Sequence, residues 1–290
     1  MNLDKLRINC TNIPLIMAGA KEPITDKQNK ELEKLLQKEK LTDRQKSRIK
    51  ILQDKRDAKQ VETIGGSAKK MLISMYCKHK CGKRMEILNE QICNNVASVK
   101  GVVTESNSVE MLSKFDNKQY YRYKKYIKND YLIGVLDAID AECLENATKI
   151  IEIKTPLQMT TFLDYLTRPI SNSTYLQLQG YMAITGLKEA ELAYCLADLP
   201  DELILKQKSL YRSKFMGVYS EERFEEIWNK VADNFRYDNI PISERIIKKK
   251  VLRDDAIIDK IYQRVEFCRA WVVNFSNNHL EMVKSGIFDT

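Results

Sequence analysis

The sequence predicts a mixed α/β fold, in which a central mixed β-sheet is flanked by helices. Short apolar runs bounded by polar turns occur at residues 131–140, 150–154 and 188–198, as expected of buried strands. Charged segments with leucine or isoleucine at helical spacing lie before and after these runs. Hydrophobic residues make up 43% of the 290 residues, which is enough for a substantial core.

The first part of the chain predicts a helical hairpin. Residues 21–60 are almost all polar or charged, and two segments each begin with Thr-Asp, a common helix N-cap signal. Leucines 32, 35 and 36 form one apolar stripe along the first segment. Two glycines, Gly65 and Gly66, then end the pattern. We therefore expect an N-terminal helical arm over residues 1–62 and one main domain over residues 63–290.

Further helices are expected on both sides of the predicted strands. Residues 67–97 have helical periodicity, with a break near Gly82, and residues 173–185 form a helix that Gly186 ends. From residue 199 onward the chain is mainly charged and helical, so that the domain has a helical C-terminal region. Residues 244–255 begin as a strand or loop, and a last helix runs from about 256 to 277.

The net charge limits the classes of partner. The chain carries 48 basic and 40 acidic residues, a formal charge of +8, which favours an anionic partner such as nucleic acid or reflects a basic solvated surface. No apolar run approaches the roughly 18 residues that a membrane helix needs. The first residues resemble neither a signal nor a transit peptide. We expect a cytoplasmic protein with no membrane contact.

Cysteine and histidine content restricts the chemistry. Seven cysteines, an odd number in a long chain, argue against a disulfide framework. Cys77, His79 and Cys81 form C-x-H-x-C, but no second pair of ligands lies nearby, so free thiols on a helix are favoured over zinc. The chain has only two histidines, so few residues are available to act as the base of a Ser-His or Cys-His pair. Carboxylates, lysine or a metal would have to carry a reaction.

One strand places two charges among isoleucines. Because side chains alternate along a strand, Glu152 and Lys154 in residues 150–154 share one face. A structural ion pair is one explanation. Asp137 offers another, since it ends the preceding apolar run and a hairpin would bring it beside Glu152. Two carboxylates beside a lysine suit Mg²⁺, which prefers carboxylate oxygen and retains waters for a phosphate substrate.

These residues occur in a longer series of motifs. Asp137 followed by Glu152-x-Lys154 has the form D…(D/E)-x-K, and Gly134 completes G-x-x-D. G-x-x-x-E occurs at Gly82 and Glu86, and Q-x-x-x-Y occurs at residues 177 and 181. In this order the motifs resemble the PD-(D/E)xK nuclease superfamily, in particular its RecB-like branch and the lambda-type phage recombination exonucleases. The superfamily's proline before the aspartate is replaced by leucine.

The resemblance implies a restriction-endonuclease-like core and a set of site residues. It implies Mg²⁺, with Mn²⁺ as an alternative, held by Glu86, Asp137, Glu152 and the Ile153 carbonyl. Lys154 would position the attacking water, and Gln177 and Tyr181 would orient the site and touch the DNA backbone. Glu90 could replace Glu86, and Asp140 could replace Asp137, although their spacing fits less well. Simple helix packing is the alternative for Gln177 and Tyr181.

The function implied by the resemblance is hydrolysis of DNA phosphodiester bonds. A phage-type exonuclease would digest one strand of a duplex and leave single-stranded DNA for an annealing protein during recombination, in the cytoplasm of a bacterial host. A homo-oligomer is a further expectation. The alternatives are an endonuclease or single-strand nuclease on the same fold, or a DNA-binding module without catalysis. Lysines 69, 70, 124, 125 and 248–250 are candidate phosphate contacts.

Overall fold

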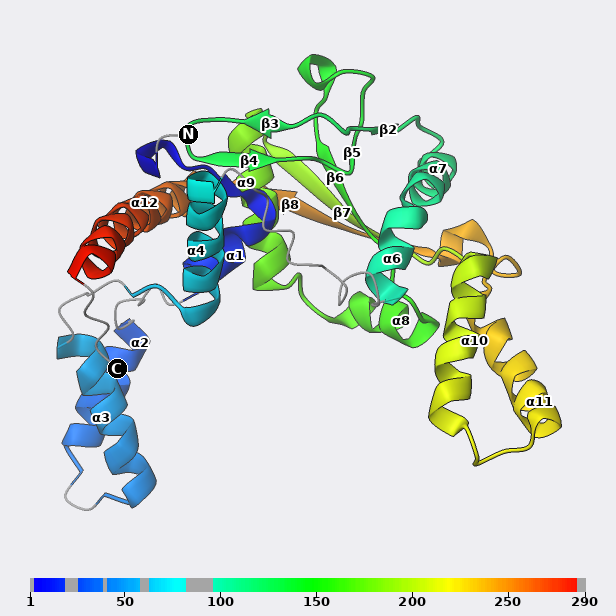
Figure 1. The fold of residues 1–290 in the computed structure, drawn as a ribbon, viewed down its shortest axis with the longest axis horizontal. Coiled ribbons are helices and arrows are strands. Elements are labelled where there is room, and N and C mark those ends of the chain that lie inside the picture. The colour runs from blue at the N-terminus through cyan, green and yellow to red at the C-terminus, as the bar shows by residue number, and fades with distance from the viewer. Residues whose placement is uncertain (1–2, 19–25, 39–40, 58–62, 82–95, 286–290) are drawn as a thin grey trace. The chain divides into compact units, whose positions relative to one another are not determined.

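The computed structural model describes residues 3–18, 26–38, 41–57, 63–81 and 96–285 (Figure 1). The chain forms two compact units. One contains residues 1–4, 14–83 and 263–290, and the other contains residues 5–13 and 84–262. The division expected from the sequence, an arm of residues 1–62 and a domain of residues 63–290, stays a prediction.

The larger unit is built on a five-stranded mixed sheet, which confirms the predicted fold class. Its strand order is β2-β5-β6-β7-β8. Only β6 and β7 are parallel, and the other neighbouring pairs are antiparallel (Figure 1). The strands are β2 (Tyr121–Arg122), β5 (Ala138–Ile139), β6 (Ile150–Lys154), β7 (Glu189–Cys195) and β8 (Ile246–Leu252).

A second, three-stranded sheet lies in the same unit and was not expected from the sequence. Its order is β1-β4-β3, formed by β1 (Ile8–Asn9), β4 (Leu132–Gly134) and β3 (Ile127–Lys128). β1 pairs in parallel with β4, with Ile8 opposite Leu132. Residues 5–13 are therefore part of the unit that contains the predicted site.

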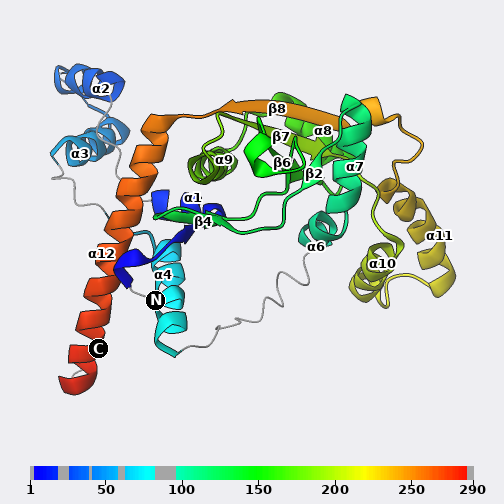
Figure 2. The ribbon, with the colours of Figure 1, turned by 90° about the horizontal axis from the view of Figure 1, so that it is seen from above.

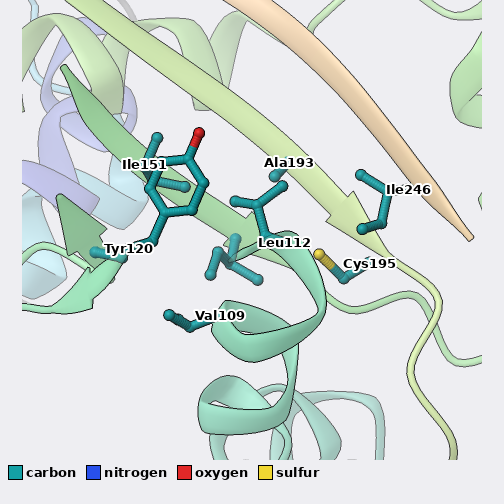
Figure 3. Packing of buried hydrophobic residues seen from close by; sticks show 9 residues of the cluster. Val109, Leu112, Tyr120, Ile151, Ala193, Cys195 and Ile246 are labelled. Atoms are coloured by element: carbon teal, nitrogen blue, oxygen red, sulfur yellow. The ribbon is translucent and has the colours of Figure 1, made fainter. Parts of the chain in front are cut away.

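The central strand β6 has two faces of different character. Ile151 and Ile153 belong to a buried cluster with Val109 and Leu112 of α7 (Glu105–Asp116). Figure 3 shows these α7 side chains against Ile151 and the β7 residues Ala193 and Cys195. Because side chains alternate along a strand, Glu152 and Lys154 point to the opposite face. The predicted separation of apolar and charged side chains along β6 is confirmed.

The opposite face of the sheet is covered by helices of the β6–β7 crossover. These are α8 (Met159–Thr167) and α9 (Asn172–Thr185). Ser171 caps α9 by accepting a hydrogen bond from the Thr174 amide at 3.1 Å. Gly186 ends the helix with φ of 79°, a left-handed conformation that favours glycine. The expected end of this helix is confirmed.

The remaining helices of the larger unit form its helical extension. α6 (Val96–Val103) precedes α7, while α10 (Asp201–Phe215) and α11 (Glu221–Ala232) lie side by side (Figures 1 and 2). Val96, Leu203 and Trp228 join these helices in a second apolar cluster. After β8, α12 (Asp255–Ser285) starts where expected but continues beyond residue 277, and its residues from 263 onward belong to the smaller unit.

The smaller unit contains the predicted helical hairpin. α2 (Asp26–Leu36) and α3 (Asp43–Asp57) pack through Leu32, Ile49 and Leu52. A bidentate ion pair joins Arg48 to Glu31, with both N–O distances at 2.9 Å. α1 (Ile13–Met17) and α4 (Gly66–Cys81) are the other helices at this end of the chain. Among the described ranges, no helix combines membrane-spanning length with sufficient apolar character.

Candidate active site

A cavity of about 950 Å³ opens on the polar face of β6. Its walls come from β6, α6, α8, α9 and the loops around β5. The predicted site side chains that lie within the described residues all line this cavity. They are Asp137, Glu152, Lys154, Gln177 and Tyr181, with Ile153 beside them. Residues from three separate stretches of sequence, around 137, 152–154 and 177–181, therefore converge on one space.

The β5–β6 pairing brings the two predicted carboxylates together. Ala138 lies opposite Ile151 in an antiparallel register, so that the next pair along is Asp137 and Glu152. Asp137 is held in place because its Oδ2 accepts a hydrogen bond from the Ile153 amide at 2.8 Å. The hairpin expected from the sequence is confirmed, and it positions Asp137 as predicted.

Glu152 is the buried centre of the cluster, with 2% of its surface exposed. Its Oε1 accepts a hydrogen bond from Lys154 Nζ at 2.5 Å and another from Gln177 Nε2 at 3.1 Å. Its Oε2 is also buried but has no hydrogen-bond partner among the described residues. A buried carboxylate oxygen without a partner is costly, which indicates a group that the protein binds there.

The charged groups of the site change the pKa values of Asp137 and Lys154. Burial, and then the charge of Glu152, raise the pKa of Asp137, although the Ile153 amide and Lys154 oppose this effect. Burial alone would lower the pKa of Lys154, but the charge of Glu152 and its hydrogen bond raise it above the usual value. Lys154 is therefore a cation at neutral pH and cannot act as a base in this state. A positive charge beside the carboxylates would favour the ionised form of Asp137.

The donor set fits a divalent cation that prefers oxygen. Asp137 and Glu152 supply carboxylates. Glu152 Oε2 has no hydrogen-bond partner among the described residues, which indicates a ligand other than protein atoms. No group of three His, Cys, Asp or Glu side chains within metal-binding reach occurs among the described residues. A cation here would be held by two carboxylates, with water or a further ligand completing its coordination. The role of the Ile153 carbonyl stays a prediction.

Gln177 and Tyr181 lie one turn apart on α9 and form a hydrogen-bonded pair beside Glu152. Gln177 Nε2 donates to Tyr181 Oη at 3.1 Å as well as to Glu152. Tyr181 is only 3% exposed, and its ring lies against Gly134. A Cβ at Gly134 would lie 2.8 Å from Tyr181 Cε1, so that only glycine leaves room for this ring. Gln177 thus contacts Glu152 and Tyr181 packs against Gly134, while their role in orienting the site stays a prediction.

Asp140, the alternative to Asp137, is engaged elsewhere. Its carboxylate accepts hydrogen bonds from the amides of Thr148 and Lys149, from the Thr148 hydroxyl, and from Lys118 Nζ at 2.9 Å. Burial alone would raise its pKa, but these bonds from Thr148, Lys118 and Lys149 lower it to about 2. Asp140 closes the β5–β6 turn and does not line the cavity.

The predicted helix motif and its alternative fall on residues 82–95. Gly82, Glu86 and Glu90 lie outside the described residues. The same G-x-x-x-E spacing occurs again at Gly101 and Glu105, which the sequence prediction passed over. Glu105 begins α7, lines the cavity, and forms an ion pair with Arg122 Nη2 at 2.8 Å. The repeated motif spacing was the signal that could have identified it.

The lysines predicted to contact phosphate differ in the groups that they contact in the structure. Lys248 pairs with Asp116 at 2.7 Å and with Glu191 at 2.9 Å, and Lys250 pairs with Glu189. Lys249 donates to the Arg168 carbonyl. Lys69 and Lys70 lie exposed on α4 in the smaller unit. Of the candidate lysines, only Lys124 lines the cavity.

Comparisons with solved structures show the class of fold. The chain is similar to a phage-related exonuclease from Haemophilus somnus 129PT, with a TM-score of 0.60 and 16% identity over 95% of this chain and 97% of the other. It is also similar to an alkaline exonuclease from Laribacter hongkongensis, with a TM-score of 0.55 and 13% identity over 99% and 96% of the two chains. No protein-family model and no curated protein sequence matches the chain. The chain therefore has an exonuclease-type nuclease fold, and the resemblance inferred from the motifs is confirmed at the level of the fold.

Proposed function

We propose that the protein is a Mg²⁺-dependent deoxyribonuclease, and specifically a phage-type exonuclease that digests one strand of duplex DNA during recombination. The observation that carries this proposal is the cluster of Asp137, Glu152 and Lys154 in one cavity, where a buried Glu152 oxygen has no partner within the described part of the chain. The similarity of the fold to two exonucleases over nearly the whole chain supports it.

Each residue of the cavity has its own role in the proposed reaction. Asp137 and Glu152 would hold the cation, which when bound would lower the pKa of a water and offset phosphate charge. Lys154 keeps its ammonium against Glu152 and supplies positive charge where an attacking water and a phosphate would meet. Gln177 fixes Glu152 Oε1 in orientation. Glu105 is our candidate for a third carboxylate, because it lines the same cavity.

Lys124 and Tyr126 would contact the DNA at the rim of the cavity. Both residues line the cavity, and Tyr126 is 70% exposed. No salt bridge to Lys124 occurs in the part of the chain that the structure describes, whereas Lys154 is paired with Glu152. An exposed lysine with an exposed aromatic ring next to it can hold a phosphate and stack on a base.

The decisive assay follows linear duplex DNA with Mg²⁺. Wild type should degrade the DNA, while Asp137→Ala and Lys154→Ala should be slower by on the order of a hundredfold or more. Lys114→Ala is the matched control, because Lys114 is an exposed lysine on α7 whose salt bridge, as far as the described ranges show, is with Glu110. EDTA should stop the reaction, and adding Mg²⁺ or Mn²⁺ separately should restore it. Undiminished cleavage by Lys154→Ala would exclude the assigned mechanism.

The form of the DNA distinguishes the remaining functions. A strict exonuclease leaves a covalently closed circle intact, whereas an endonuclease on the same fold cuts it. A single-strand nuclease prefers single-stranded DNA over the duplex. A DNA-binding module without catalysis would bind the linear duplex and degrade none of these substrates. The single-strand annealing partner, the homo-oligomer and the bacterial cytoplasm stay predictions.

A further inference from the structure

A fully buried lysine supports the wall of the cavity from behind. Lys100 lies on α6, whose residues Ala97 and Gly101 line the cavity, but Lys100 itself is 0% exposed. Its Nζ donates a hydrogen bond to the Pro156 carbonyl at 2.9 Å. Pro156 is two residues beyond Lys154 and also lines the cavity. Lys100 therefore connects α6 to the segment that follows the catalytic strand.

Burial of this ammonium is expensive for the fold. Val96, four residues earlier on α6, packs in an apolar cluster with Leu203 and Trp228. No salt bridge to Lys100 is found in the described ranges, although the charge of Asp198 partly stabilises the ammonium. Burial lowers the pKa of Lys100 to about 8. An apolar side chain of similar length would avoid this cost, so stability alone does not explain a lysine here.

A tyrosine holds the next carbonyl of the same segment. Tyr237 Oη donates toward the Leu157 carbonyl at 3.1 Å and toward the Asn234 carbonyl at 2.8 Å. Lys100 Nζ lies 5.5 Å from the centre of the Tyr237 ring, within the range of a cation–π contact. Two successive carbonyls, those of Pro156 and Leu157, are thus fixed by two side chains that contact each other.

We infer that Lys100 is a positioning residue, which together with Tyr237 clamps residues 155–157 and thereby fixes Lys154 at the end of β6. This inference rests on the proposed nuclease function. The clamp acts through the backbone and does not touch the substrate. Because Lys154 must meet both Glu152 and the phosphate, a small displacement of the strand end would reduce the rate of the chemical step more than binding.

The test replaces the ammonium with a methyl thioether of similar length. Lys100→Met should retain the fold and a thermal midpoint at or near that of wild type, while kcat on linear duplex DNA falls by about tenfold to a hundredfold with little change in KM. Hydrogen–deuterium exchange of a peptide covering residues 155–158 should become faster. Tyr237→Phe should produce the same changes to a smaller extent, because it removes the hydroxyl bond to the Leu157 carbonyl but keeps the ring beside Lys100. Lys114→Met is the control for replacing an exposed lysine.

The outcomes separate the inference from the proposed function. Unchanged exchange over residues 155–158 in both variants, or an unchanged kcat in Lys100→Met, would overturn the clamp. A lowered midpoint together with faster exchange throughout the protein would assign Lys100 a general structural role and overturn it as well. If wild type degrades no DNA, the proposed function fails, whereas the exchange measurement still decides whether Lys100 holds this segment.

Discussion

Lys154 Nζ lies 2.5 Å from Glu152 Oε1, on the face of β6 that points into the cavity. The pair occupies one oxygen of the carboxylate and leaves the other, Oε2, buried and without a partner among the residues that the structure describes. An ion pair and a metal ligand, which the sequence offers as alternatives for Glu152, are therefore compatible. Lys154 offsets the charge of the carboxylate in the absence of a cation, and one oxygen remains for a cation.

Binding of Mg²⁺ should stabilise the protein through these carboxylates. A ligand that binds only the folded state at a hundred times its Kd adds about 2.7 kcal/mol to the free energy of unfolding. We expect Mg²⁺ to raise the thermal midpoint of wild type but not of Asp137→Asn or Glu152→Gln. Asp140→Asn is the matched control, which should retain the Mg²⁺ effect because Asp140 lies outside the cavity. An equal effect in Asp137→Asn would show that the cation binds elsewhere.

Glu105 should be the third carboxylate of the site and act on the cation through water, because no three acidic side chains of the described residues lie within direct metal-binding reach. Glu105→Gln should reduce the rate of DNA degradation by on the order of a hundredfold, because Glu105 lines the cavity with Asp137 and Glu152. Arg122→Gln removes the ion pair of Glu105 but keeps its carboxylate, so it should retain most activity. Glu86→Gln tests the motif position predicted from the sequence. A loss confined to Glu86→Gln would assign the role to Glu86.

Gly134→Ala should destabilise the protein and slow the reaction. Its Cβ would lie 2.8 Å from Tyr181 Cε1, and the ring is buried, so the ring or the strand must move. Overpacking of this kind costs about 1–3 kcal/mol. Urea unfolding and the nuclease assay measure the two effects. Gly66→Ala is the control, since no atom lies within 4 Å of its added Cβ, and a comparable loss there would show that the Tyr181 contact is not the cause.

Asp140 should stabilise the fold in a pH-dependent way. Its pKa falls from 3.8 to about 2 on folding, so its contribution is fully present above pH 3.8 and is lost as the pH falls toward 2. Asp140→Asn should therefore cost on the order of 2 kcal/mol at neutral pH. The difference from wild type, measured by urea unfolding, should shrink at about pH 3. Asp238→Asn, at an exposed turn, is the matched control for replacing an aspartate by asparagine.

The sequence was sufficient for features that depend on local alternation. The period-2 pattern of residues 150–154 separated the isoleucines from Glu152 and Lys154, and the short turn before them implied the hairpin that brings Asp137 close. Side-chain alternation and hairpin pairing are both set by near neighbours in the chain. That is why most of the predicted site residues converge in the structure.

Features that depend on distant contacts were not predictable. β1 pairs with β4 across more than a hundred residues, and nothing in the two short segments encodes this pairing. The lysines at 248 and 250 resemble a basic patch in sequence, yet they pair with acidic residues brought to them by the fold. Lys100 has no local sign of burial, because its neighbours on α6 become a core face only when α10 and α11 pack there.

The last prediction concerns the coupling between Gln177 and Tyr181. Gln177 Nε2 bonds to both Glu152 and Tyr181 Oη, so the tyrosine hydroxyl fixes the amide that orients the carboxylate. Gln177→Ala should lower kcat by about tenfold or more, and Tyr181→Phe should lower it less, because the ring still packs against Gly134. If the hydroxyl acts through Gln177, the double variant should be no slower than Gln177→Ala alone. Additive losses in this cycle would show that Tyr181 contributes through a separate contact, such as one with DNA.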